Sequence, residues 1–162
     1  MKIFLLFLLF GIIACSSGIE QKLEKPVIIG NFSWNEWKNH AKWKSYSADN
    51  YFIPNEKIEL IRSFLDLQNE KFLIFSGSWC GDSESELPKI IKIFDSLGIS
   101  SVNYNLYGVD REKREPEGIA EQYKIEKVPT LIVLRNGTEI GRIIEFPQNT
   151  WEDDIFLIIS KK

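Results

Sequence analysis

The passage from a short apolar run into an amphipathic stretch, with a cysteine between the two, most constrains the fold of this chain. Residues 72–77 are largely aliphatic and aromatic, which is typical of a strand buried on both faces. From 83 to 97, apolar side chains recur at steps of three and four, which predicts an amphipathic helix ending near Gly98. The sequence Trp-Cys-Gly-Asp-Ser at 79–83 joins them. Cys80 therefore lies where a helix begins, and the positive end of the helix dipole favours its thiolate over its thiol.

The rest of the chain continues to alternate between strand and helix patterns. A helical pattern that contains Ile58 and Ile61 follows Pro54 and precedes the first strand. Downstream we expect a strand at 102–109, a short helix at 116–123, strands at 130–134 and 139–145, and a helix at 151–159. Asn136-Gly137 between the last two strands is a strong hairpin signal. One crossover followed by an antiparallel pair predicts an α/β fold, with a central mixed β-sheet flanked by helices.

An aromatic-rich segment, residues 27–54, precedes this domain. Trp34, Trp37 and Ala41 lie at helical spacing, and Ser33 fits as the cap of that helix. We expect the segment to pack onto the domain. A groove for a partner or substrate is the alternative that the sequence leaves open.

The amino terminus resembles an export signal. Lys2 is followed by an apolar run, residues 3–13, which is short of the roughly 20 residues needed to span a membrane. The run leads into Ile-Ala-Cys-Ser at 13–16, which resembles the lipobox of bacterial lipoproteins. That resemblance implies cleavage before Cys15 and a lipid on its sulfur. An ordinary signal peptide or an uncleaved anchor is the alternative.

This interpretation divides the chain into a signal peptide at 1–14, a lipidated tether at 15–26, the aromatic-rich extension at 27–54 and the folded domain at 55–162. Ser16 follows Cys15 in place of an acidic sorting residue, which favours the periplasmic face of the outer membrane in a bacterial cell envelope. The chain has 2 cysteines, so lipid on Cys15 would leave Cys80 as the one thiol of the mature protein.

Composition excludes several classes of function. About 148 residues remain after the signal, which is enough for one domain with a proper core. The net charge of −3 arises from interspersed charges without a basic block, so no nucleic-acid partner is expected. One histidine and one free thiol do not make a metal site, and no cofactor is expected. His40 lies in a different segment from Cys80, as expected for a surface residue rather than a general base.

The motif at 79–83 resembles a thioredoxin active site whose second cysteine has become serine. Pro88 lies where thioredoxins keep the proline that kinks the helix after the motif. Val128, Pro129 and Thr130 resemble the cis-proline loop of the same family. The chain is thus similar to the thioredoxin-like superfamily, and the resemblance implies a thioredoxin-like fold.

The resemblance covers about residues 55–160 and extends to a narrower group. The chain looks like exported bacterial thioredoxin family lipoproteins that share the Trp-Cys-Gly-Asp-Ser motif and the segment at 139–147. The aromatic-rich extension then precedes a thioredoxin-like domain.

The resemblance also assigns roles to the matching residues. Cys80 would be the nucleophile, with an inert buried cysteine as the alternative. Ser83 stands in the place of a resolving thiol, and would either donate a hydrogen bond to the thiolate or cap the helix. The expected substrate-binding residues are Trp79, Gly81, Asp82, Val128, Pro129 and Thr130. An extended peptide would pair with the Val128 backbone, whereas Trp79 could equally be part of the core.

Two departures from the thioredoxin pattern bear on mechanism. Thioredoxins that reduce disulfides have a buried acid six residues before the nucleophile, and Ile74 stands there in this chain, so no base remains for a resolving step. Asp82 replaces the proline of thioredoxin and opposes the helix dipole by its like charge. The sequence therefore leaves the net effect on Cys80 open.

The expected function is that of a lipid-anchored protein whose Cys80 attacks disulfides, with an external thiol resolving the adduct. Its partners would be disulfide-containing or thiol-bearing envelope proteins, an external thiol or reductase, and the membrane through the lipid on Cys15. The alternative is a redox-inactive module that binds envelope polypeptides or a partner protein through the Pro129 surface and the aromatic segment.

Overall fold

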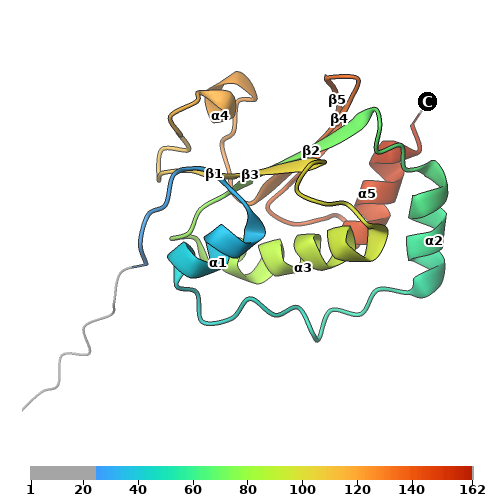
Figure 1. Cartoon of the computed structure of the whole chain (residues 1–162), viewed down its shortest axis with the longest axis horizontal. Helices are drawn as coiled ribbons and strands as arrows, with labels where there is room; N and C mark the ends of the chain where they lie inside the picture. Colours follow the sequence, from blue (N-terminus) through green and yellow to red (C-terminus); the bar gives the residue numbers. More distant parts are fainter. Residues whose placement is uncertain (1–24, 162) are drawn as a thin grey trace, which may run out of the picture.

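The computed structural model describes residues 25–161, which form a five-stranded sheet with helices on its two faces (Figure 1). In chain order the elements are β1 (Gly30–Phe32), α1 (Trp34–Ala41), α2 (Asn55–Phe64), β2 (Glu70–Ser76), α3 (Gly81–Leu97), β3 (Tyr104–Gly108), α4 (Ile119–Gln122), β4 (Thr130–Arg135), β5 (Thr138–Ile144) and α5 (Trp151–Ile159). The expected signal peptide, Cys15 and most of the tether lie outside the described residues. Between residues 25 and 161, no helix combines the length and the apolar character needed to cross a membrane.

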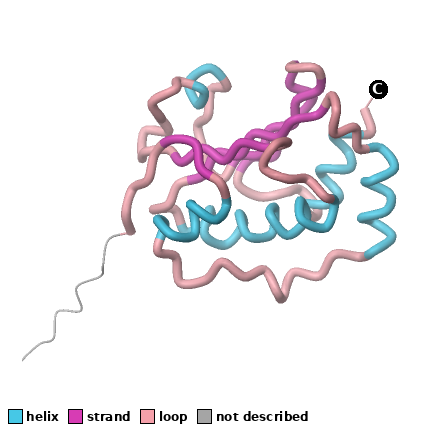
Figure 2. Tube along the Cα trace, in the orientation of Figure 1, coloured by secondary structure: helices cyan, strands magenta, loops and turns pink. Residues whose placement is uncertain are grey.

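The strands lie in the order β1-β3-β2-β4-β5. β2 and β3 pair in parallel, because α3 carries the chain back across the sheet between them. The other three pairs are antiparallel. The predicted α/β fold with a mixed central sheet and flanking helices is confirmed, and Figure 2 shows the strands as one band between the helices.

The strand register gives the sheet two different ends. Ser76 of β2 lies beside Gly108 of β3, and Thr130 of β4 lies at the same end. We call this the motif end, because the 79–83 motif follows β2 directly. At the other end Glu70 of β2 pairs with Arg135 of β4, next to the turn that joins β4 to β5. We call this the hairpin end.

Two hydrophobic clusters cover the two faces of the sheet. Residues of β2 alternate between them: Phe72 and Ile74 belong to the larger cluster, and Leu73 and Phe75 belong to the smaller one. This is the two-residue period of a strand buried on both faces. The larger cluster packs against α1, α2, α3 and α5, whereas the smaller one includes Ala120 of the short helix α4. One face is therefore covered by long helices and the other by one short helix and loops.

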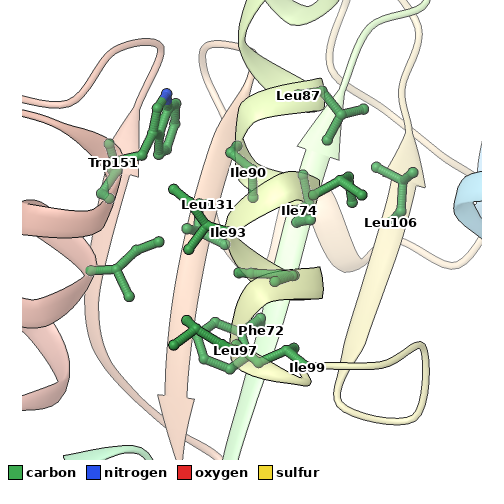
Figure 3. Packing of buried hydrophobic residues seen from close by; sticks show 14 of the residues in the cluster. Phe72, Ile74, Leu87, Ile90, Ile93, Leu97, Ile99, Leu106, Leu131 and Trp151 are labelled. Atoms are coloured by element: carbon green, nitrogen blue, oxygen red, sulfur yellow. The ribbon is translucent and has the colours of Figure 1, made fainter. Parts of the chain in front are cut away.

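The helix after the motif, α3, supplies much of the larger cluster. Figure 3 shows Leu87, Ile90, Ile93 and Leu97 on the side of α3 that faces the strands. The helix ends as predicted at Gly98, whose φ of 76° is the left-handed conformation that glycine adopts without a steric penalty.

The aromatic-rich segment is built into the larger cluster. Ser33 caps α1 as expected, in a reciprocal capping box with Glu36. Trp37 and Trp43 are buried at 0% and 5% exposure. The sequence did not indicate β1, which has only three residues and pairs antiparallel with β3.

The fourth helix is shorter than predicted. We expected a helix at 116–123, but α4 spans only Ile119–Gln122. Gly118 precedes it with a φ of 73°, a left-handed conformation that cannot belong to a right-handed helix. The helix can begin only after that glycine.

Candidate functional site

Cys80 lies at the junction of β2 and α3, at the motif end of the sheet. It is the N-cap residue of α3, and its side chain makes no capping hydrogen bond. Its backbone fixes the turn, because the Cys80 amide donates to Gly77 O (2.9 Å) and the Glu84 amide donates to Cys80 O (3.1 Å). The thiol is free and partly buried, and it donates to Val128 O at 3.5 Å. The sulfur thus lies at the positive end of the helix dipole, beside a backbone carbonyl.

Ser83, one helical turn after Cys80, is fully buried. Its Oγ accepts a hydrogen bond from the Gly77 amide at 3.2 Å. This contact differs from the two roles expected for Ser83, since it fastens the end of β2 to the first turn of α3. Gly81 and Asp82 in the same turn are exposed.

Trp79 forms one wall of the site. Its indole Nε1 donates to Val109 O at 3.0 Å, which fixes the ring beside the loop after β3. Position 77, beneath the ring, must be glycine, because a Cβ there would lie only 2.8 Å from Trp79 Cε2. Two cations lie over the ring: Arg111 Cζ is 5.0 Å and Lys113 Nζ is 5.8 Å from the ring centroid. The indole is therefore held from below and covered by positive charge.

The loop before β4 forms a second side of the site, in contact with Cys80. The Val128–Pro129 peptide bond is cis, and the Val128 side chain is buried in the smaller cluster. Pro129 O accepts a hydrogen bond from the Glu145 amide (2.7 Å), and Thr130 Oγ1 donates to Lys127 O (2.7 Å). The fold thus brings Cys80 and this loop together from segments 48 residues apart.

The amino-terminal segment fastens the residue before the motif, Ser78. The Trp43 indole Nε1 donates to Ser78 O at 2.6 Å. The Ser78 hydroxyl donates to Pro26 O and accepts from the Ile28 amide at 3.0 Å. Ser78 is fully buried, so these bonds satisfy polar groups that water does not reach. The aromatic segment therefore supports the loop that presents Cys80.

Glu84 in the first turn of α3 makes a second link to the amino-terminal segment. Its carboxylate forms an ion pair with Lys25 and accepts a hydrogen bond from the Lys44 amide at 2.8 Å. Burial alone would raise the pKa of Glu84, but the hydrogen bonds from Lys25 and from the Lys44 amide outweigh burial and lower it below its ordinary value. Glu84 therefore stays ionised and holds the two segments together.

Other residues considered for the chemistry lie in different surroundings. Ile74 is fully buried within the larger cluster and offers no ionisable group. His40 is exposed on α1, and its ring centroid lies 6.2 Å from that of Phe32. In the part of the chain that the structure describes, no three His, Cys, Asp or Glu side chains gather to hold a metal ion.

Sequence reasoning missed Ser78, Glu84 and Trp43 as supports of the site, and Arg111 and Lys113 as its cationic cover. A serine, an acid or a lysine has no periodic pattern that identifies its partner. These contacts join residues that are 32 to 59 positions apart. Only the packing of the segments reveals them.

Comparison with known proteins relates this chain to the thioredoxins. A scan against protein-family models finds no match. The chain is 32% identical over 80 residues to a thioredoxin from Echinococcus granulosus, a match that covers 48% of this chain and 69% of the relative. It is 29% identical over 70 residues to an H-type thioredoxin from Fagopyrum esculentum, covering 43% of this chain and 55% of the relative.

The fold also has a counterpart among solved structures. A crystal structure of a protein of unknown function from Pseudomonas aeruginosa matches with a TM-score of 0.50 and 16% identity, over 68% of this chain and 76% of that chain. This similarity supports the fold alone. Together with the identity to the Echinococcus granulosus thioredoxin, the comparisons show that this chain belongs to the thioredoxin-like superfamily.

Proposed function

We propose that this protein is a membrane-anchored, thioredoxin-like protein that carries out monothiol-disulfide exchange through Cys80. The observation that carries the proposal is the placement of Cys80: a free, partly exposed thiol at the start of α3, whose Sγ lies 3.5 Å from Val128 O. Position 83, one turn away, holds a buried hydroxyl that cannot form a disulfide. The thiol can therefore begin an exchange, and a thiol from elsewhere must complete it.

The exchange conserves atoms and electrons without a cofactor. The Cys80 thiolate attacks one sulfur of a substrate disulfide, a new bond forms between those two sulfurs, and the other substrate sulfur leaves as a thiolate. A first external thiolate then attacks the Cys80 sulfur of the mixed disulfide, releases the second substrate sulfur as a thiolate and becomes disulfide-bonded to Cys80. A second external thiolate attacks the sulfur of the first and releases the Cys80 thiolate. Two external thiols are oxidised to a disulfide for each substrate disulfide that is reduced. The substrate and the external thiol come from disulfide-containing or thiol-bearing envelope proteins, or from a small thiol or reductase.

Substrate docking follows from the two walls of the site. Val128 presents its backbone next to the sulfur, where an extended peptide can pair with it as a strand does. Trp79, with Arg111 and Lys113 over its ring, is the second group beside the cysteine that a bound peptide would contact. Gly81 and Asp82 are exposed in the turn between them and complete the contact surface.

The test is a single-turnover reaction of the full chain with a peptide disulfide, followed by mass spectrometry. Wild type is expected to form one mixed disulfide per chain and to turn over only after an external thiol is added. Cys80→Ser, the matched control, is expected to form no adduct. Ser83→Cys is expected to release reduced peptide without added thiol, because the second thiol lies one helical turn from the first.

Two outcomes would contradict the proposal. One is a folded wild-type protein that forms no adduct at Cys80. The other is repeated turnover by wild type without any added thiol, because one thiol cannot supply two electrons for each disulfide.

The anchor is a separate part of the proposal. We infer that Cys15 carries lipid and holds the protein at the periplasmic face of the outer membrane in a bacterial envelope. Support comes from the lipobox-like sequence around Cys15 and from Ser16 after it. Cys15→Ala should move the protein from the membrane fraction to the soluble fraction and abolish lipid labelling, and retention in the membrane would contradict the inference.

A redox-inactive binding module is the competing function. Two of the aromatic residues that suggested it, Trp37 and Trp43, are buried in the larger cluster and cannot contact a partner. A binding module would keep its partners when Cys80 is replaced by serine. Exchange chemistry would lose every partner that is held through a mixed disulfide.

A further inference from the structure

The loop after β3 places two cations over the wall of the site. Arg111 Cζ and Lys113 Nζ lie 5.0 Å and 5.8 Å from the Trp79 ring centroid, within the range of cation–π contact. The same indole is fixed by its hydrogen bond to Val109 O. Trp79 is adjacent to Cys80 in the chain, and both pack against the smaller cluster, so the two cations cover the residue next to the reactive cysteine.

Hydrogen bonds within the loop hold it in shape. The Lys113 amide donates to Asp110 O (3.1 Å), and the Arg114 amide donates to the Asp110 carboxylate (2.8 Å). The Asp110 amide in turn donates to Arg114 O (3.0 Å). Lys113 has a φ of 63°, a left-handed conformation that is uncommon outside glycine, and its Nζ donates to Arg111 O (2.8 Å). The loop thus closes on itself and presents both cations on the same side.

The acids near this loop leave the two cations available. Asp110 pairs with Arg114 instead, at 3.9 Å. Lys127, in the loop before β4, pairs with Glu145 at 2.6 Å. Among the described residues, Arg111 and Lys113 belong to no ion pair, and neither do the exposed acids Glu112 and Asp82.

We propose that Arg111 and Lys113 make Cys80 select disulfides in polypeptide segments that carry acidic side chains next to the cysteine. The inference rests on the proposed exchange function and names the substrate class of the same site. An acidic side chain beside the substrate sulfur would meet the guanidinium and the ammonium while the backbone pairs with Val128. A basic segment would be repelled by the two cations, while the exposed acids Asp82 and Glu112 reduce the size of the preference. An exposed cation–π contact contributes little to stability. We therefore assign the two cations to the choice of substrate and not to holding the fold together.

The experiment compares three peptides that differ only in the residues flanking a cysteine: glutamate, glutamine or lysine. Each cysteine carries a 2-thiopyridyl group, so attack by the Cys80 thiolate on the peptide sulfur releases pyridine-2-thiolate, which is followed by its absorbance. With the full chain at low ionic strength, the second-order rate constant is expected to be about three- to tenfold higher for the glutamate peptide than for the lysine peptide. Raising the salt to about 0.5 M should reduce this ratio, because surface charges are screened.

Substitutions test whether Arg111 and Lys113 cause the preference for the glutamate peptide. Arg111→Gln and Lys113→Gln should each lower the glutamate-to-lysine ratio, and the double variant should bring it near one, while the rate with the glutamine peptide changes less than twofold. Arg62→Gln is the matched control, because Arg62 donates to Ser96 O near the far end of α3. It should leave the ratio unchanged.

The outcomes separate this inference from the function on which it rests. Equal rates with all three peptides in wild type would overturn the acidic preference and leave monothiol exchange standing. A preference that survives the double variant would also overturn it, since other groups would then carry the selection. A folded protein whose Cys80 reacts with none of the peptides would overturn the exchange function and this inference together.

Discussion

The hairpin end of the sheet contains a buried ion pair, whereas the motif end contains a free thiol and two cations that pair with no acid among the described residues. At the hairpin end, the Glu70 carboxylate is 0% exposed and accepts hydrogen bonds from Arg135 Nη2 (2.7 Å) and Nε (3.1 Å). Asn103 Nδ2 donates to Leu67 O (3.1 Å), and the Asn136 amide donates to Asn69 O (2.8 Å). Hydrogen bonds between polar groups thus join loops from three parts of the chain at this end.

At the motif end, several groups have no such partner within the described residues. The Cys80 thiol has only a long contact to a carbonyl, and Arg111 and Lys113 rest on an aromatic ring without an acid. The buried Ser76 hydroxyl has no hydrogen-bond partner. The difference teaches that the buried Glu70–Arg135 pair holds the fold at the hairpin end, whereas Cys80, Arg111 and Lys113 are not used in this way at the motif end, where Ser78, Ser83 and Glu84 hold the segments together.

The largest effect should come from opening the hairpin end. Arg135→Met would leave the Glu70 carboxylate buried without its cation, and also removes the Arg135 hydrogen bonds to Ile159 O and Lys161 O. We expect the free energy of unfolding to fall by about 3–5 kcal/mol, measured by urea denaturation. The rate constant of Cys80 with a neutral disulfide should stay within about twofold in the molecules that remain folded. A loss of less than about 1 kcal/mol would show that this ion pair does not hold the end together.

An intermediate effect is expected from filling the space under Trp79. Gly77→Ala places a Cβ 2.8 Å from the indole, so the ring or the backbone must move. We expect a loss of about 1–3 kcal/mol, a change in tryptophan fluorescence and an altered rate at Cys80. Gly81→Ala is the control in the same turn, because nothing lies within 4 Å of its Cβ. It should be neutral or stabilise the protein by up to about 1 kcal/mol. Equal effects of the two substitutions would argue against a fixed indole.

The smallest effect concerns pH and the link between α3 and the amino-terminal segment. Glu84→Gln removes the charge that pairs with Lys25, and should cost about 0.5–1 kcal/mol near neutral pH. The folded pKa of Glu84 lies below its unfolded value, so its contribution is complete above the unfolded value of about 4.3 and is lost as the pH falls through the folded pKa.

Urea denaturation of wild type and Glu84→Gln from pH 7 down to about pH 3 checks this expectation. The two free energies of unfolding should converge as the solution becomes acidic. A gap that stays constant over the whole range would mean that the Glu84 charge does not carry the link.

Much of the fold could be predicted from local patterns. The continuous apolar run at 72–77 indicated a strand buried on both faces, and the apolar residues at 83–97 recur with a period near 3.6. β2 and α3 follow these patterns closely, because apolar residues must reach the faces that are buried. Asn136-Gly137 marked the β4–β5 turn for a similar reason, since both residues adopt a positive φ there. Prediction failed at β1 and at the start of α4, where short segments carry too few residues to show a period.

The candidate site could likewise be predicted only in part. The sequence by itself determined the placement of the Cys80 thiol at a strand-to-helix junction and the family resemblance of the 79–83 motif and the Val128–Thr130 loop, because these depend on neighbouring residues. Only the tertiary structure decided that Val128 O lies beside Sγ, that Trp43 supports Ser78, and that Arg111 and Lys113 cover Trp79. The physical reason is that single hydrogen bonds and cation–π contacts between distant segments follow from how helices and loops pack on the sheet, and no local periodicity records them.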